Sequence, residues 1–353
     1  MPDFVSGSIW ENLSPKPITA LRATSQFHNP RANPEDVALI IAHEDNQLIA
    51  LVGLLPDYIN GDQKFPVFSN TCWWVDQKKG KQLAIPLFLK AFSASNQRMF
   101  MTDCTPHTIS ILQKTNWFNF PDTPYGIRGF LKFNLHEIIP QKLKTGAQIK
   151  HLLKIVDSIL NFLRLPYLGF CKLRFSEKQI TKTIVSKIDD ELLQFINTHN
   201  KNEFIRRSGV ELEWILKFPW ITAPQNTTEL YSYPFSHHVK SFEQYLIKVS
   251  GHHEILGLMM ISIRDGHMKV PYAYFENVYA EKMLQVIYQQ ALQKNITTLT
   301  IFDQDLTSKM QTEKHPFIFR KKIRRLIAIS KSLDKFYLKD TRFQDGDGDV
   351  VFT

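Results

Sequence analysis

The sequence predicts an α+β protein, an α/β arrangement with mixed sheets, built from two tandem domains. Each domain is expected to hold a central mixed β-sheet flanked by helices. A length of 353 residues suggests about two domains of roughly 100–200 residues each. Hydrophobic residues make up 43% of the chain, which is enough to fill two cores. The order strand-strand-strand-helix-strand is also expected once in each half, which indicates a repeat at the scale of a domain.

The first half contains short apolar runs that are bounded by polar turns. VALIIAH and QLIALVGLL are typical of buried strands, and the Glu44-Asp45-Asn46 segment between them predicts a hairpin. Leu83, Leu87 and Ala91 have helical spacing. The strands expected here are 37–43, 47–55, 67–75, 98–103 and 130–135, and a second helix is expected over 108–115.

The second half repeats this order. The Asp265-Gly266 dipeptide predicts a hairpin turn between two strands. Helices are expected over 187–199, 203–218 and 280–294, and strands over 245–249, 254–264, 267–275, 296–302, 320–329, 336–338 and 350–352. A connecting helix over 147–163, ended by Leu165-Pro166, joins the halves. The expected domains are therefore 1–140 and 180–353, with 141–179 as a helical connection.

The net charge and the cysteine content indicate which partners and which cellular location to expect. A net charge of +9 favours anionic partners such as phosphate-bearing cofactors, acidic glycans, nucleic acid or a membrane surface. The run 320–325 is the most basic, but no aromatic platform accompanies it, so nucleic acid is not expected. Three widely spaced cysteines favour a reducing, cytoplasmic location. No signal peptide and no membrane-spanning segment is expected.

The segment from Asp76 to Gln82 has the features of an anion-binding turn. It follows the apolar run that ends in Trp73-Trp74-Val75, and it precedes a helix. The first amides of a helix have no partners within the helix and bind anions well. Gly80 permits a close approach of the backbone, and three lysines raise the local potential.

This turn resembles the cofactor motif of the GNAT superfamily of acyl-CoA N-acyltransferases. That motif is Gln or Arg, two free positions, Gly, one free position, then Gly or Ala. Gln77 and Gly80 match it, whereas Gln82 departs from its last position. The resemblance implies that acetyl-CoA or another acyl-CoA binds as co-substrate, with its pyrophosphate on the turn and its pantetheine arm along the preceding strand. The implied cofactor-binding residues are Trp74, Val75, Gln77, Lys78, Lys79, Gly80, Lys81 and Gln82.

The same resemblance implies an acyl transfer by direct attack of an acceptor on the thioester. The acceptor would be an amine or hydroxyl of a small molecule, a glycan or a peptide. The family's tyrosine acid has no counterpart, because Leu112 stands at its position, and Tyr274 to Tyr279 in the second half contains no glycine. The chain thus resembles Fem-type and related tandem GNAT proteins with a degenerate second domain. A non-catalytic binding protein and a Fem-like transferase with an aminoacyl-tRNA donor are the alternatives.

Four polar residues near strand ends are candidates for proton transfer or nucleophilic attack. Asp103 and His107 follow the strand after the motif helix, and histidine is the residue type used most often for proton transfer. Asp57 and Cys104 are further candidates. The competing interpretations are that Asp103 caps a helix, that His107 is an exposed loop residue and that Cys104 is a small core residue.

No metal site is expected. Asp345, Asp347 and Asp349 are spaced as at the start of a calcium loop, but a turn before a last strand is the preferred interpretation. The adjacent pairs His237-His238 and His252-His253 would point to opposite faces of a strand, which makes joint ligation of one metal difficult.

Overall fold

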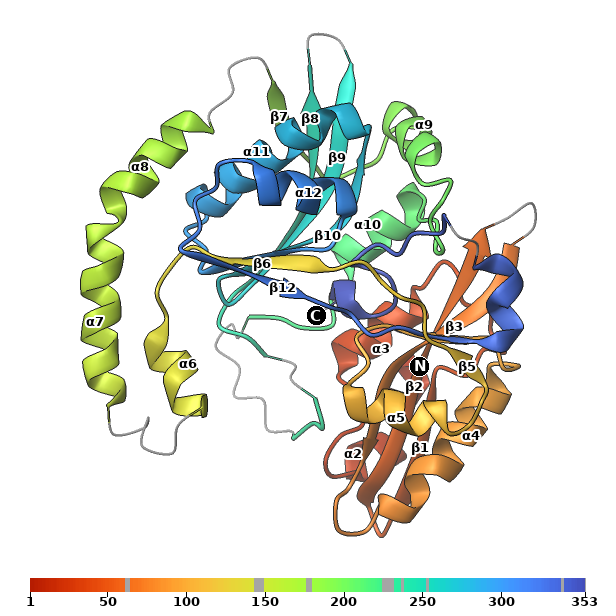
Figure 1. The fold of residues 1–353 in the computed structure, drawn as a ribbon. Helices are drawn as coiled ribbons and strands as arrows, with labels where there is room; N and C mark the ends of the chain where they lie inside the picture. The colour runs from red at the N-terminus through yellow and green to blue at the C-terminus, as the bar shows by residue number, and fades with distance from the viewer. Residues whose placement is uncertain are drawn as a thin grey trace. The chain divides into compact units, whose positions relative to one another are not determined.

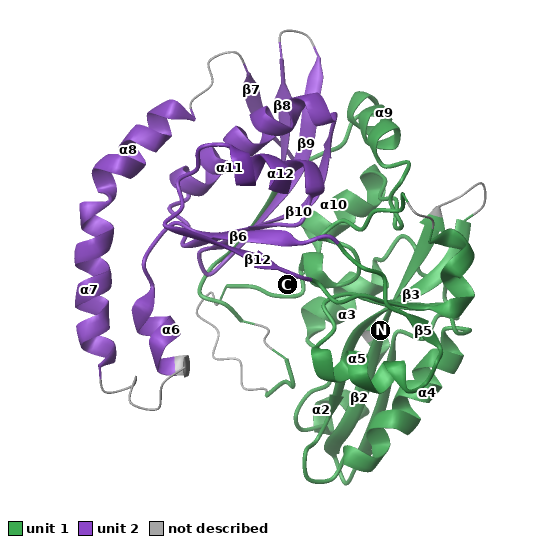
Figure 2. Ribbon diagram, viewed as in Figure 1, with its two compact units in different colours: residues 1–123, 186–245, 325–353 green, residues 124–185, 246–324 purple. Residues whose placement is uncertain are grey.

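The structure is a computed structural model that describes residues 1–60, 64–142, 149–175, 180–223, 232–235, 238–251, 254–337 and 340–352. The chain forms two compact units (Figures 1 and 2). Unit 1 comprises 1–123, 186–245 and 325–353, and unit 2 comprises 124–185 and 246–324. These units differ from the consecutive ranges 1–140 and 180–353 that the sequence suggested, because each unit takes in segments from both halves of the chain.

Unit 1 contains a six-stranded mixed sheet in the order β1-β2-β3-β4-β13-β5. The first three strands form antiparallel pairs, and β3 pairs with β4 in parallel across a helical crossover. The strands are β1 (Leu39–Glu44), β2 (Gln47–Asn60), β3 (Lys64–Val75), β4 (Met99–Met101), β5 (Phe118–Asn119) and β13 (Ala328–Ser330).

The crossover helix α4 (Ala84–Ala94) covers one face of this sheet. Its residues Leu87, Phe88 and Ala91 recur at helical spacing and pack against Val52 and Phe68 of the sheet. The other helices of unit 1 are α1 (Pro2–Val5), α2 (Ser8–Asn12), α3 (Ala20–Phe27), α5 (Pro106–Gln113), α9 (Asp190–His199) and α10 (Gly209–Lys217), with the 3₁₀ turns η1 (Lys81–Leu83), η4 (Lys331–Phe336) and η5 (Val350–Phe352).

Unit 2 contains a seven-stranded mixed sheet in the order β12-β6-β11-β10-β9-β8-β7. Its strands are β6 (Gly126–Phe130), β7 (Thr181–Val185), β8 (Phe242–Ser250), β9 (Ile255–Arg264), β10 (His267–Phe275), β11 (Thr298–Ile301) and β12 (Phe319–Ile323). Its helices are α6 (Leu135–Lys142), α7 (Lys150–Leu163), α8 (Leu165–Arg174), α11 (Ala280–Gln293) and α12 (Gln304–Thr312), with the 3₁₀ turn η3 (Asn277–Tyr279). None of the helices described in either unit is long and apolar enough to cross a membrane.

Both units are built on the same strand-strand-strand-helix-strand order, as the sequence predicted. It is β1-β2-β3-α4-β4 in unit 1 and β8-β9-β10-α11-β11 in unit 2. Each sheet also takes one strand from the other half of the chain: β6 pairs with β11 and β12, and β13 pairs with β4 and β5. The units therefore interleave along the sequence, and the fold class is α+β with two mixed sheets.

Several expected elements were wrong. The run 320–329 is not one strand but β12 and β13, which lie in different sheets. Residues 131–135 lead into α6 and are not a strand, and 350–352 form a buried 3₁₀ turn in which Phe352 stacks on Trp220. Phe336 ends η4, and Leu338 lies outside the described residues. Pro166 does not end the helical segment, because it lies in the first turn of α8, where its missing N–H has no role.

Candidate functional site

The strand β3 separates from its parallel neighbour well before it ends. β3 pairs with β4 only at Phe68 and Ser69, and then continues to Val75. From Asn70 onward its one strand partner among the described strands is β2. The other edge of this stretch therefore presents main-chain N–H and C=O groups that can pair with an extended ligand. This is the strand end at which the sequence placed the pantetheine arm.

A β-bulge lies at the start of this separated stretch. Asn70 pairs with Leu54 and Cys72 with Gly53, so Thr71 is an extra residue on β3. The side-chain Nδ2 of Asn70 donates to the Gly53 and Cys72 carbonyls, both at 3.2 Å, and so satisfies carbonyl groups beside the bulge. Bulges re-aim side chains and are common next to active sites.

Thr71 lines a cavity of about 110 Å³ whose walls combine aromatic side chains with one cation. Arg22 of α3 donates to Thr71 Oγ1 at 2.5 Å, and its guanidinium lies 4.3 Å from the ring centroid of Trp220. Both side chains are more than nine-tenths buried, yet Arg22 Nε and Trp220 Nε1 have no acceptor among the described residues. Two buried donors without acceptors favour a ligand that brings an oxygen acceptor. The remaining lining residues are Pro17, Ile18, Thr19, Ile221, Tyr233, Phe235 and Asp349.

The turn after β3 is held together by its own aspartate. Asp76 Oδ1 accepts hydrogen bonds from the amides of Lys79 at 2.8 Å and Lys78 at 2.9 Å, which lower the pKa of Asp76. The Gly80 amide donates to the Asp76 carbonyl at 2.9 Å. Three amides of the expected anion-binding turn are therefore engaged inside the turn. The amides of Lys81 and Gln82 remain, since they have no acceptor among the described residues.

Gly80 is required by the packing of the turn. Its φ of −99° suits any residue, but a Cβ there would lie 2.5 Å from the Ile49 carbonyl oxygen and 2.9 Å from the Asp76 nitrogen. The glycine thus lets the turn pack against β2, which is a different reason from the approach of a phosphate suggested by the sequence. Lys78, Lys79 and Lys81 are exposed around it.

A surface depression of about 390 Å³ lies at the end of β3. It brings together five of the eight expected cofactor-binding residues, whereas Gly80, Lys81 and Gln82 lie outside it. Exposed Lys79 has one weak ion pair, 3.5 Å from Glu44, and Asp76 adds one negative charge inside the turn, so the three lysines still leave the turn with a net positive charge. The lining residues are Gln47, Trp74, Val75, Asp76, Gln77, Lys78 and Lys79.

The expected catalytic residues follow β4. Asp103 is half-exposed, with its Oδ1 3.9 Å from Arg325 Nε, and His107 is exposed in the first turn of α5. Neither lines the two cavities above. Thr105, not Asp103, caps α5 by accepting from the Thr108 amide. Burial raises the pKa of Cys104 to about 12, with Asp103 adding to the shift, which disfavours the thiolate that a nucleophile needs.

Asp57 belongs to a buried ion network that the sequence did not reveal. It lies inside β2, where its carboxylate is 2.6 Å from Arg31 and 2.7 Å from Arg207. Arg31 Nε in turn lies 2.8 Å from Glu211 Oε1 at the start of α10. Because these groups are hidden from water, their mutual neutralisation is structural, and Asp57 is not available for proton transfer.

The Asp345–Asp349 segment is a turn, as expected, and it packs at the point where β3 and β4 separate. Gly348 has φ +76°, and a Cβ there would lie 2.7 Å from Ser69 Oγ and 2.9 Å from Thr102 Oγ1. Asp345 pairs with Arg325 at 2.8 Å, and Asp347 is fully buried. These carboxylates take part in packing. No group of His, Cys, Asp or Glu in the described ranges could hold a metal ion, and His237, His252 and His253 lie outside those ranges.

Unit 2 has the same strand separation without a cationic turn. β10 pairs with β11 only from His267 to Lys269 and then continues to Phe275. The turn that follows carries Glu276, and Asn277 donates to Asp305 at 2.5 Å. Carboxylates therefore occupy the region where unit 1 has lysines, which is unfavourable for a pyrophosphate.

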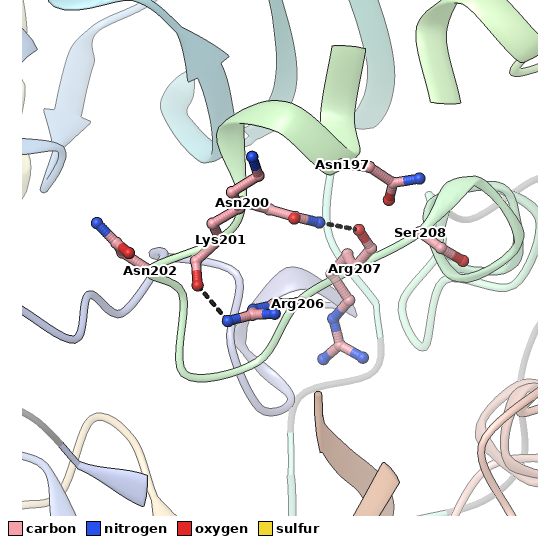
Figure 3. A pocket seen from close by; sticks show the side chains of 7 residues that line it. All are labelled: Asn197, Asn200, Lys201, Asn202, Arg206, Arg207 and Ser208. Carbon is pink, nitrogen blue, oxygen red and sulfur yellow. Dashed lines mark hydrogen bonds between the residues drawn. The ribbon is translucent and has the colours of Figure 1, made fainter. Parts of the chain in front are cut away.

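A third depression, of about 610 Å³, lies in the loop between α9 and α10 (Figure 3). The side-chain Nδ2 of Asn200 donates to the Arg207 carbonyl at 2.9 Å, and the Arg206 guanidinium donates to the Lys201 carbonyl. Figure 3 shows these two bonds bracing the loop. Since Arg207 is also paired with Asp57, this basic loop holds one of the arginines of the buried ion network in place.

The chain was compared with known proteins. No protein-family model matches it, and no curated protein matches it significantly. It is similar to the solved structure of a GCN5-related N-acetyltransferase from Kribbella flavida, with 8% identity, 83% of this chain covered and a TM-score of 0.46. A GCN5-related N-acetyltransferase from Anabaena variabilis gives 9% identity, 82% coverage and a TM-score of 0.42. The chain spans 60% and 62% of the lengths of these two structures.

Proposed function

We propose that unit 1 binds an acyl-CoA at the separated end of β3 and transfers its acyl group to an amine or hydroxyl acceptor. The observation that carries this proposal is the course of β3, which leaves β4 after Ser69 and ends at the lysine-bearing turn. An extended thioester arm needs an unpaired strand edge, and a diphosphate needs positive charge at the end of that edge. In unit 1 the free edge of β3 comes first and the lysine-bearing turn follows it, which is the order that such a donor needs.

The donor would contact the turn mainly through side chains. The amides of Lys78 and Lys79 are engaged by Asp76, so the groups left for the pyrophosphate are the lysine ammonium groups and the amides of Lys81 and Gln82. Lysine binds phosphate as a mobile point charge. Binding of the donor should therefore depend strongly on ionic strength.

The acceptor would enter the cavity beside Thr71. Its buried donors on Arg22 and Trp220 suit a carbonyl or carboxylate oxygen of the acceptor, and the aromatic walls suit its apolar part. The acceptor nitrogen or oxygen would attack the thioester carbonyl, and the CoA thiolate would leave as the acceptor loses its proton. Asp103 and His107 remain the candidates for the proton transfers.

Calorimetric titration with acetyl-CoA tests the donor site. Exposed Lys78 and Lys81 can be reversed to glutamate without disturbing the core, whereas Gly80→Asp would distort the turn against Ile49. We expect Lys78→Glu with Lys81→Glu to weaken binding about tenfold or more, because each reversal replaces an attraction of about 1 kcal/mol by a repulsion. Lys90→Glu, on the exposed side of α4, is the matched control.

Three results would decide whether the chain binds acetyl-CoA, whether it does so at this turn and whether it transfers the acyl group. Absence of acetyl-CoA binding by the wild type would reject the proposal. Equal effects of the paired reversal and of Lys90→Glu would place the donor elsewhere. Binding without thiol release over a panel of amines and alcohols would indicate a protein that binds the donor and does not transfer its acyl group.

The acceptor cavity needs a test of its own. Thr71→Val should raise the acceptor KM and leave CoA affinity unchanged, since it removes only the hydroxyl to which Arg22 donates.

A further inference from the structure

The helices α7 and α8 of unit 2 turn an apolar face outward. Arg164 alone separates them, with φ −85° and ψ −13°, so α8 continues from α7 as a nearly continuous helical segment. Figure 2 draws the pair at the margin of unit 2. Eight large apolar side chains on these helices are between 55% and 79% exposed. Leu163 and Leu165 lie at the junction on either side of Arg164, and the other six are Leu152, Ile155, Ile159, Phe162, Phe170 and Leu173. These six define the outer apolar face.

The spacing of these residues makes the face continuous. On α7 they recur every three or four residues, which confines them to a sector of about 80°. On α8, Phe170 follows Ile159 by 11 residues, close to three helical turns, and Leu173 follows by three more. Isolated exposed apolar residues are normal on a protein surface, but a continuous stripe marks an interaction site.

Polar residues attach this helix pair to unit 2. Asp157 accepts from the Leu135 and His136 amides at 2.9 and 3.0 Å and from His136 Nδ1 at 2.8 Å. Asn161 exchanges two hydrogen bonds with the Phe133 backbone, and Arg164 donates to the Pro316 carbonyl at 2.7 Å. A surface helix normally packs its apolar stripe against the core. Here polar side chains face the unit together with the buried Cys171 and Phe175, and the outer apolar face is left for another partner.

The charges beside the outer apolar face have one sign. Residues 149–175 contain five lysines and arginines and a single acidic residue, Asp157, which is buried and engaged as described. Lys154 and Lys172 are exposed and follow the helix on one flank of the apolar face. An apolar stripe flanked by cations matches the interface of a bilayer that contains anionic lipids, where apolar side chains enter the acyl boundary and lysines reach phosphate.

We propose that α7 and α8 bind in the plane of an anionic lipid membrane surface. The segment 150–174 carries five lysines and arginines and one aspartate, whereas a helix that crosses a membrane has few or no charges, so the outer apolar face lies in the interface. Nucleic acid is disfavoured, since the stripe offers it no charge. This inference is independent of the proposed acyl transfer.

Vesicle co-sedimentation of the full chain tests this proposal. The probes are phosphatidylcholine vesicles with about 30% phosphatidylglycerol and vesicles of phosphatidylcholine alone. We expect binding to the anionic vesicles, weakened about tenfold or more by Phe162→Glu or Leu173→Glu. Lys154→Glu with Lys172→Glu should weaken binding to anionic vesicles about fivefold or more and leave binding to neutral vesicles unchanged.

Val278→Glu is the matched control, because Val278 is an apolar residue of unit 2, 73% exposed and outside these helices. It should bind vesicles like the wild type. Unchanged circular dichroism and thermal melting will establish that each variant is folded. Three results would overturn the proposal: no vesicle binding by the wild type, equal binding by Phe162→Glu, or a wild-type dimer in the absence of lipid that Phe162→Glu converts to monomer. The last result would assign the face to a second copy of the chain.

Discussion

Removal of the negative charge at Glu211 should destabilise unit 1 in a pH-dependent way. Glu211 Oε1 lies 2.8 Å from Arg31 Nε, and its Oε2 accepts from the Ser208 amide at 2.7 Å. Burial raises the pKa of Glu211, but the charge and hydrogen bond of Arg31, with Ser208 and Arg207, outweigh burial and lower it to about 2. Relative to 4.5, this shift corresponds to about 3 kcal/mol of unfolding free energy at pH 7.

The sign of the pH dependence follows from this lowered pKa. The contribution is complete above the unfolded-state pKa and is lost as the pH falls through the folded-state pKa. At pH 3 about 2 kcal/mol of it should be gone. Glu211→Gln should thus cost about 3 kcal/mol at pH 7 and about 1 kcal/mol at pH 3.

Urea unfolding followed by tryptophan fluorescence measures this effect in unit 1, because all six tryptophans lie in that unit. Glu35→Gln, at an exposed position of the same unit, is the control and should change stability by less than about 0.5 kcal/mol. A deficit of Glu211→Gln that is equal at pH 3 and pH 7, or below about 1 kcal/mol at pH 7, would refute the reasoning.

Three further predictions follow from single side chains. Gly80→Ala should lower the free energy of unfolding of unit 1 by about 1–3 kcal/mol, because its Cβ would meet the Ile49 carbonyl at 2.5 Å; urea titration measures this. Cys104→Ala should leave acyl transfer unchanged, and Cys104 should react slowly with iodoacetamide at pH 8, since its pKa is raised to about 12. Burial raises the pKa of Asp347 to about 7, so the folded state holds its proton more tightly and stability should fall as pH rises from about 4 to about 7. Asp347→Asn should remove that fall, which unfolding at pH 5 and pH 8 would show.

Local patterns predicted the elements, and long-range pairing decided where they lie. The run 267–275 was predicted as a strand and is β10, because its alternation and the Asp265-Gly266 turn are local signals. Periodicity carries no information on which strand pairs with which. It therefore could not show that β6 and β13 each join the sheet of the other half of the chain. The same limit hid the pairing of Asp57 with Arg31 and Arg207, the latter 150 residues away in sequence.

The sequence predicted the place of the turn in the chain but not the hydrogen bonds inside it. Gln77 and Gly80 located the turn correctly after the third strand. The pattern could not show that Asp76 engages the Lys78 and Lys79 amides, since an aspartate at this position could also face solvent. Nor could it show the bulge at Thr71, which depends on the register with β2.

Amide hydrogen exchange with and without CoA tests the central claim most directly, because it reports on the backbone of both units in the intact chain. The account predicts that CoA slows exchange over 70–82, on the separated end of β3 and its turn, and leaves 270–279, the matching segment of unit 2, unchanged. Slowed exchange at 270–279 without change at 70–82, or no change at either segment at saturating CoA, would contradict it.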